Sequence, residues 1–190
     1  MKVLGIAGSP RRGGNTDRLL AEVLKGAADC GAEVETIVVN DLDILPCQHC
    51  DACFEAGRCK YGDDMQMVYQ KLENADRVVL ASPLHFMGIT AQAKALIDRC
   101  QALWARKYVL EIPPLGDNRK RKGLFVSVGG IQKKDLFKAA LVTAKAFFAT
   151  LDIEYAGDLL FAGIDDADAI LEHTEALQQA YEAGCKLAAN

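Results

Sequence analysis

The sequence predicts an α/β protein built on a doubly wound, mostly parallel sheet of five strands. Two observations lead to this prediction. Five short apolar segments have the character of buried strands, and segments with helical periodicity separate them. The chain has 190 residues, of which 51% are apolar and 25% charged, so it can bury a sizeable core within one domain. The same figures exclude a disordered or fibrous protein.

The expected strands are apolar runs, several of which stop at turn-forming residues, as strands buried on both faces of a parallel sheet do. The first run stops at Gly8-Ser9-Pro10, the third at Ser82-Pro83 and the fourth at Gly129-Gly130. Ligands bind at the carboxyl ends of such strands, so these loops are the informative ones. The predicted strands cover residues 2–7, 33–39, 77–81, 123–128 and about 153–160.

The expected helices lie between these strands. Between 16 and 28, apolar residues recur at Leu19, Leu20, Val23 and Leu24, with the spacing of an amphipathic helix. Asp63 or Asp64 can cap a helix that runs to about residue 74. Segment 40–62 has neither helical nor strand periodicity. Further helices are predicted over 90 to about 106, 134 to about 150, and 165–187, the last with acidic residues in its first turn.

The loop after the first strand is suited to bind a phosphate group. It reads Gly8-Ser9-Pro10-Arg11-Arg12-Gly13-Gly14-Asn15-Thr16 and leads directly into a helix. Small residues let backbone amides approach an anion, and the helix N-terminus adds favourable partial charge. Gly14 and Asn15 replace the lysine and hydroxyl residue of a P-loop, which argues against nucleotide hydrolysis. A glycine-rich turn that only connects strand to helix is the alternative.

Residues 8–20 resemble the opening signature of the NADPH-dependent FMN reductase and iron–sulfur flavoprotein families, which share the flavodoxin-like fold. That signature is Gly-Ser-Pro-Arg, then Asn-Thr within a few residues, then a leucine-bearing helix. The resemblance implies that the cofactor is FMN. Its phosphate would be held by Ser9, Arg11, Asn15 and Thr16, with Gly14 beside them among the cofactor-binding residues.

Residues 82–88 resemble the segment that lines the isoalloxazine ring in these families, and residues 91–99 match their Ala-x-x-Lys-x-x-Ile/Leu-Asp-Arg helix. Leu84 stands where an aromatic residue is common. Phe86 and Met87 offer a soft apolar wall to a flat ring. A partly buried loop with His85 as a structural residue is the alternative. The residues expected around the flavin ring are Pro83, Leu84, His85, Phe86, Met87, Gly88, Gly129 and Gly130.

Four of the seven cysteines fall within thirteen residues, in the pattern Cys47-x2-Cys50-x2-Cys53-x5-Cys59. Thiolates at this spacing can converge on successive iron atoms of one cubane. A four-thiolate zinc site usually pairs two C-x2-C units across a longer gap. Zinc, and free or transiently oxidised thiols, stay open as alternatives. The pattern, followed by Asp63-Asp64-Met65, resembles the iron–sulfur flavoproteins, which implies that these four cysteines bind one [4Fe–4S] cluster.

The remaining cysteines, Cys30, Cys100 and Cys185, lie in helical or helix-end contexts and are expected to pack as small apolar residues. The first apolar stretch is too short for a signal peptide. Without a secretory signal we do not expect a disulfide framework. No apolar run approaches the roughly 20 residues of a membrane span. Acidic residues outnumber basic ones by 26 to 22, unlike a nucleic-acid binder. We expect a cytoplasmic protein without membrane or nucleic-acid partners.

We therefore expect residues 1–190 to form a single flavodoxin-like FMN-binding domain, with helices on both faces of the sheet and a cysteine-rich loop, 40–63, inserted after the second strand. The resemblance implies electron transfer between a [4Fe–4S] cluster and FMN, from a ferredoxin-type redox protein to a quinone, oxygen or peroxide, in a homodimer or homotetramer. We assign no general acid or other catalytic side chain. The alternatives are an NAD(P)H-dependent FMN or quinone reductase without a cluster, and a zinc-stapled binding module.

Overall fold

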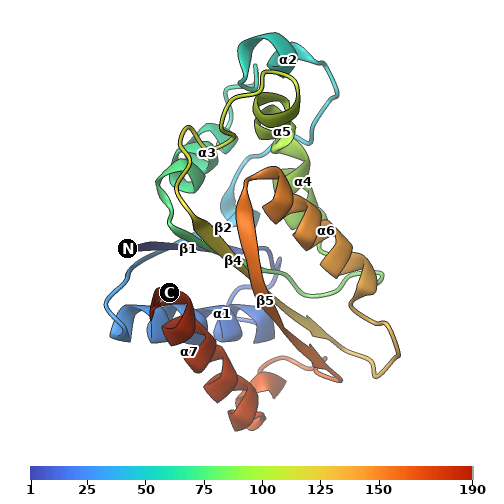
Figure 1. The fold of residues 1–190 in the computed structure, drawn as a ribbon. Helices are drawn as coiled ribbons and strands as arrows, with labels where there is room; N and C mark the ends of the chain where they lie inside the picture. The colour runs from blue at the N-terminus through green and yellow to red at the C-terminus, as the bar shows by residue number, and fades with distance from the viewer. Residues whose placement is uncertain (190) are drawn as a thin grey trace.

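The computed structural model describes residues 1–189 and contains a five-stranded, all-parallel sheet (Figure 1). The strand order is β2-β1-β3-β4-β5, which is the flavodoxin-like order. The order reverses between β1 and β3, so the fold predicts a ligand crevice beyond the carboxyl ends of these two strands. The strands are β1 (Lys2–Ala7), β2 (Glu33–Val38), β3 (Arg77–Ala81), β4 (Arg121–Gly129) and β5 (Ile153–Ala162).

Helices cover both faces of the sheet, as the sequence predicts (Figure 1). Alternate residues of each strand point to opposite faces. Val78 and Leu80 of β3 pack with the helices of one face, and Val79 and Ala81 with those of the other. The first face carries α3 (Met65–Asn74), α4 (Ala91–Arg99), α5 (Gln101–Tyr108) and α6 (Lys138–Thr150), and the second carries α1 (Asn15–Asp29) and α7 (Thr174–Ala189).

Three of the predicted helices are wrong in extent. The helix predicted from 134 begins only at Lys138, because Asp135 has a φ of +59° and the chain turns there. The helix expected over 90–106 is two helices, because the chain leaves helical geometry at Cys100, where ψ is 3°. The helix expected from 165 begins only at Thr174, after the short helix η2 (Ala169–Glu172). Residues 165–168 remain irregular because they approach the carboxyl edge of the sheet, and Asn15 binds the carbonyl of Asp166 there.

The prediction that Cys30 and Cys185 only pack as apolar residues is also wrong. They form a disulfide between the end of α1 and α7, with Cα atoms 5.4 Å apart. The backbones of the two helices are in close contact nearby. A Cβ atom on Gly184 would collide with the carbonyl oxygen of Val23, so only glycine fits there. This close approach explains how two thiols far apart in sequence come within bonding distance. Cys100 is buried and free, as expected.

The segment between β2 and α3 holds the clustered cysteines. It begins with the short helix η1 (Val39–Asp41) and contains a second short helix, α2 (Ala52–Ala56), where the sequence indicates no regular structure. In Figure 1, α2 lies beside α5 at the end of the molecule away from α7. None of the helices within residues 1–189 is long and apolar enough to cross a membrane.

Candidate functional site

A cavity of about 280 Å³ lies at the carboxyl ends of β1, β3 and β4, where the strand order reverses. This volume is close to the lower end of the range of about 300–1,000 Å³ that is typical of small-molecule sites. We call it the flavin pocket. The loops after β1, β3 and β5 and the end of β4 form its wall, with the residues Ser9, Pro10, Arg11, Gly14, Asn15, Thr16, Pro83, Leu84, His85, Val128, Gly130, Ile164 and Asp165.

The loop after β1 presents backbone amides to this pocket. Gly13 has a φ of +64°, a conformation that glycine adopts readily, and the chain then enters α1 at Asn15. The first N–H groups of a helix have no partner within it. The Ser9 hydroxyl accepts a hydrogen bond from the Arg11 amide at 3.1 Å and so holds the loop closed. A glycine-containing loop followed directly by a helix N-terminus is an arrangement that phosphate-binding sites of other proteins use.

Asn15 lines the pocket, but its side chain is engaged elsewhere. Its Nδ2 donates to the carbonyl oxygen of Asp166 at 2.8 Å, and its Oδ1 accepts from the amide of Ile170 at 3.2 Å. Asn15 is only 7% exposed, although the sequence assigns it to phosphate binding. In the structure, its side-chain amide instead fastens the loop after β5 to the start of α1.

The loop after β3 is fixed to the sheet by buried hydroxyl groups. Ser82 Oγ accepts from the amide of Thr90 at 3.1 Å, and the Thr90 hydroxyl donates to the carbonyl oxygen of Gly8 at 2.5 Å. The amide of Leu84 donates to Val128 at 2.9 Å. The loops after β1 and β3 are therefore held together, and Pro83, Leu84 and His85 form one side of the flavin pocket.

Four residues of the expected ring site do not line the pocket. His85 and Gly88 exchange two backbone hydrogen bonds and close a tight turn, in which Phe86 and Met87 have φ values of +49° and +69°. This turn leaves the Phe86 side chain fully exposed. Gly129 packs against Leu84 and Leu136 instead of facing the cavity. The structure thus separates Phe86, Met87, Gly88 and Gly129 from Gly130, which does line the pocket.

Sequence reasoning missed four lining residues, Pro10, Val128, Ile164 and Asp165. Asp165 lies close to Gly130, since a Cβ atom on that glycine would meet its carboxylate. The sheet topology is the signal that could have identified these residues. All parallel strands end at the same edge of the sheet, so the residues after β5 approach those after β4. Because the sequence predicts a helix from residue 165, this approach to the end of β4 was not expected.

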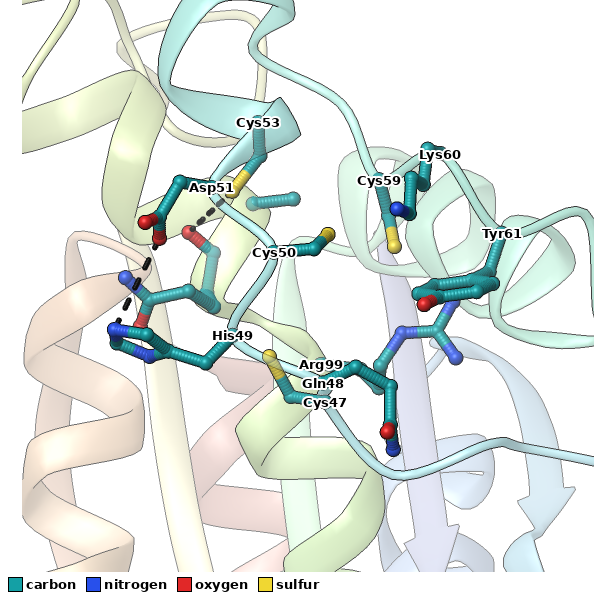
Figure 2. A pocket seen from close by; sticks show the side chains of 12 residues that line it. Cys47, Gln48, His49, Cys50, Asp51, Cys53, Cys59, Lys60, Tyr61 and Arg99 are labelled. Atoms are coloured by element: carbon teal, nitrogen blue, oxygen red, sulfur yellow. Dashed lines mark hydrogen bonds and ion pairs between the residues drawn. The ribbon is translucent and has the colours of Figure 1, made fainter.

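The four clustered cysteines line a second, much smaller cavity, of about 20 Å³, which we call the cysteine cavity (Figure 2). Positive φ values at His49 and Asp51 curl the loop between the first three cysteines. Cys53 is buried, and its burial raises the pKa of its thiol. The negative charges of the other three thiolates raise that pKa further. The cavity wall is completed by Gln48, His49, Asp51, Lys60, Tyr61, Arg99, Gln101 and Ala102.

The residues of the cysteine cavity fit an iron–sulfur cluster. In residues 1–189, no three His, Cys, Asp or Glu side chains meet closely enough to hold a single metal ion. A cubane has a separate iron for each thiolate, so it needs four cysteines around a cavity rather than at one point. Arg99 adds a positive charge to this wall, and among the described residues its buried Nε has no hydrogen-bond partner. A buried cationic side chain beside four thiols fits a negatively charged cluster.

Arg99 also holds both ends of the cysteine segment. One terminal nitrogen, Nη1, donates to the carbonyl oxygen of Leu45 at 2.7 Å and to Asp63 at 2.5 Å, and Nη2 donates to Asp63 at 2.9 Å. Burial by itself would raise the pKa of the Asp63 carboxyl, but these bonds and those from the Leu45 and Met65 amides lower it. The loop between Leu45 and Asp63 is thus closed by one ion pair.

The helix α4 connects the two cavities. Thr90 caps its N-terminus and binds Gly8 beside the flavin pocket, while Arg99, its last residue, lines the cysteine cavity. At about 1.5 Å per residue, the nine residues of this helix span about 13 Å. The two cavities share no lining residue. One rigid element therefore sets their separation.

The chain is similar in sequence to known flavin-dependent proteins. A sequence model of the NADPH-dependent FMN reductase family matches residues 1–155. An iron–sulfur flavoprotein of Methanocaldococcus jannaschii is 44% identical over 103 residues, which are 54% of this chain and 53% of that protein. Another, of Methanosarcina thermophila, is 34% identical over 130 residues, which are 68% of this chain and 64% of that protein. The matches thus cover about half to two thirds of these relatives.

Among solved structures, a flavone reductase superposes with a TM-score of 0.74 and is 26% identical, covering 99% of this chain and 62% of that one. The superposition confirms the flavodoxin-like fold over nearly the whole chain.

Proposed function

This chain belongs to the NADPH-dependent FMN reductase family, and on that premise we propose that it is an FMN-dependent oxidoreductase that also carries a [4Fe–4S] cluster. The observation that carries the proposal is the cysteine cavity, in which four thiols and a buried guanidinium surround one space. The names of the iron–sulfur flavoproteins of Methanocaldococcus jannaschii and Methanosarcina thermophila support it.

The flavin pocket would hold FMN. Ser9, Arg11, Gly14 and Thr16, with the first amides of α1, would bind the phosphate, because helix N-termini and small residues favour an anion there. Pro83, Leu84 and His85 would lie along the ring, and the Asn15 side chain would keep the loop after β5 in place. Bound FMN supplies one-electron and two-electron chemistry, and the protein orients it and tunes its potential.

Cys47, Cys50, Cys53 and Cys59 would bind the cluster as thiolates. A bound cluster supplies electrons one at a time. The donor would be a ferredoxin-type redox protein and the acceptor a quinone, oxygen or peroxide, in a homodimer or homotetramer. We assign no proton-transferring side chain, since the chemistry resides in the cofactors.

A second candidate is an NAD(P)H-dependent FMN or quinone reductase without a cluster, in which NAD(P)H is the substrate. The description of the matching family favours it. The two candidates differ in a simple respect. The reductase predicts that NADPH alone bleaches the flavin rapidly, whereas the cluster-bearing protein responds slowly or not at all to NADPH and is reduced by ferredoxin.

The deciding experiment is a visible spectrum of anaerobically purified protein, with iron, acid-labile sulfide, zinc and FMN quantified on the same sample. About four irons and four sulfides together with FMN support the proposal. Flavin without iron points to the reductase. One zinc per chain without iron would mean that the four cysteines hold a structural zinc ion.

A further inference from the structure

We propose that Arg99 donates its Nε–H to a sulfur atom of the cluster in the cysteine cavity, so that a side chain of α4 sets the reduction potential of that cluster. This inference rests on the proposed function, since it requires the cluster. Arg99 is not one of the four cysteine ligands. It is the last residue of α4, whose N-terminal cap, Thr90, binds Gly8 beside the flavin pocket.

The position of Arg99 is closely determined. Its side chain is 1% exposed, and its guanidinium is held by Asp63 and by the carbonyl oxygen of Leu45. The ring of Tyr61 covers it, with the guanidinium carbon 5.5 Å from the ring centroid. Figure 2 shows the guanidinium beside this ring, on the same side of the cavity as Cys59. A side chain with so many contacts points its remaining donor in one direction.

That remaining donor is Nε. It is buried and has no hydrogen-bond partner within residues 1–189. A buried charged donor without an acceptor destabilises the folded state, so a folded protein provides an acceptor for it. Arg99 lines the cysteine cavity together with the four clustered cysteines. The acceptors that line this cavity include the four cysteine sulfurs.

Sulfur atoms of an iron–sulfur cluster carry negative charge and accept N–H hydrogen bonds. The potential of such a cluster depends on its net charge, on hydrogen bonds to its sulfurs and on its exposure to solvent. Arg99 supplies a hydrogen bond and a buried positive charge. Both favour the reduced, more negative cluster, so Arg99 raises the reduction potential.

The test combines a spectroscopic measurement on the unmodified protein with one substitution. Protein containing [15Nε]arginine is purified anaerobically, its cluster is reduced, and pulsed electron paramagnetic resonance is used to look for weak 15N coupling. We expect such coupling in the wild type and its loss in Arg99→Lys. We also expect the midpoint potential of the cluster to become more negative in Arg99→Lys, which keeps a positive charge but has no Nε–H in this geometry.

Arg106→Lys is the matched control. Arg106 also holds the cysteine segment, through the carbonyl oxygen of Gly57 at 2.7 Å, but it does not line the cysteine cavity. We expect the cluster potential of this variant to equal that of the wild type. An equal fall in both variants would mean that loosening the loop causes the shift and would overturn the proposal.

Each remaining outcome is decisive. If the wild type holds four irons but has no 15N coupling, the proposed function survives and the role of Arg99 is wrong. If Arg99→Lys loses its iron, its cluster cannot be compared with that of the wild type. The proposal then depends on the wild type alone, and absence of 15N coupling there overturns it. If the wild type binds no iron, the proposed function fails first, and the role of Arg99 fails with it.

Discussion

The flavin pocket and the cysteine cavity are built in different ways. The flavin pocket lies at the edge of the sheet, and the loops that form it are fastened to strands and to one another by buried hydroxyls and backbone hydrogen bonds. The cysteine cavity lies in a segment of about 25 residues between β2 and α3, whose two ends are held by Arg99 and Asp63. The first site is supported by the fold, and the second depends on a few side chains.

Cys50→Ala gives the largest expected effect and tests whether the two sites are independent. Cys50 is exposed and lines the cysteine cavity, so its loss should remove one ligand without disturbing the core. We expect iron to fall from about four per chain to nearly zero, while FMN stays bound. Iron, sulfide and FMN analysis measures this.

Cys100→Ala is the control for Cys50→Ala, because Cys100 is free but does not line the cysteine cavity. We expect it to keep its iron. Full iron in Cys50→Ala would contradict the ligand assignment, and loss of FMN together with iron would contradict the separation of the two sites.

Thr16→Val tests the flavin pocket, as Cys50→Ala tests the cysteine cavity. The Thr16 residue is 2% exposed at the start of α1, and valine replaces its hydroxyl with little change in shape. Removing one hydrogen bond to a charged phosphate costs about 1.5–3 kcal/mol, so FMN should bind about 10–100-fold more weakly. Fluorescence titration of flavin-free protein measures the affinity.

Iron in Thr16→Val should be unchanged. Thr143→Val, on the exposed side of α6, is the matched control and should bind FMN like the wild type. An unchanged FMN affinity in Thr16→Val would remove Thr16 from the phosphate site.

The Cys30–Cys185 disulfide should stabilise the face of the sheet that carries α1, without affecting the cysteine cavity on the other face. It closes a long loop, with a sequence separation of 155 residues, and we expect it to contribute about 2–4 kcal/mol to the free energy of unfolding. Thermal unfolding with and without dithiothreitol measures this. Cys30→Ser should have the stability of the reduced wild type in both conditions, and a wild type whose stability does not change with the reductant would contradict the prediction.

Asp63→Asn should weaken the closure of the cysteine segment in a manner that depends on pH. The bonds from Arg99 lower the pKa of Asp63 below its ordinary value of 3.8, so its carboxylate stabilises the folded protein above that pH. This contribution is lost as the pH falls through the lowered pKa. We expect the variant to be less stable by about 1–3 kcal/mol at pH 7 and the difference from the wild type to shrink progressively as the pH falls below 3.8. Thermal unfolding at several pH values measures the difference, and a difference independent of pH would argue against the ion pair.

Local patterns were enough to predict much of the fold and part of the site. The expected strand 2–7 coincides with β1, and the loop after it lines the flavin pocket as predicted. These predictions worked because apolar runs, glycines and a helix start are local features. They failed for Asn15, which has a distant partner in the loop after β5. They also failed for Phe86, which a tight turn between His85 and Gly88 directs away from the pocket.

The amino-acid sequence by itself determined the class of sheet, the glycine-containing loop that leads into α1 and the spacing of the four cysteines, because each follows from neighbouring residues. Only the tertiary structure decided that Asp165 reaches the flavin pocket, that Cys30 meets Cys185, and that Arg99 lies among the cysteines with a free Nε. Such contacts depend on how strands and helices are placed against one another. No local pattern encodes that placement, since the partners are separated by tens of residues or more.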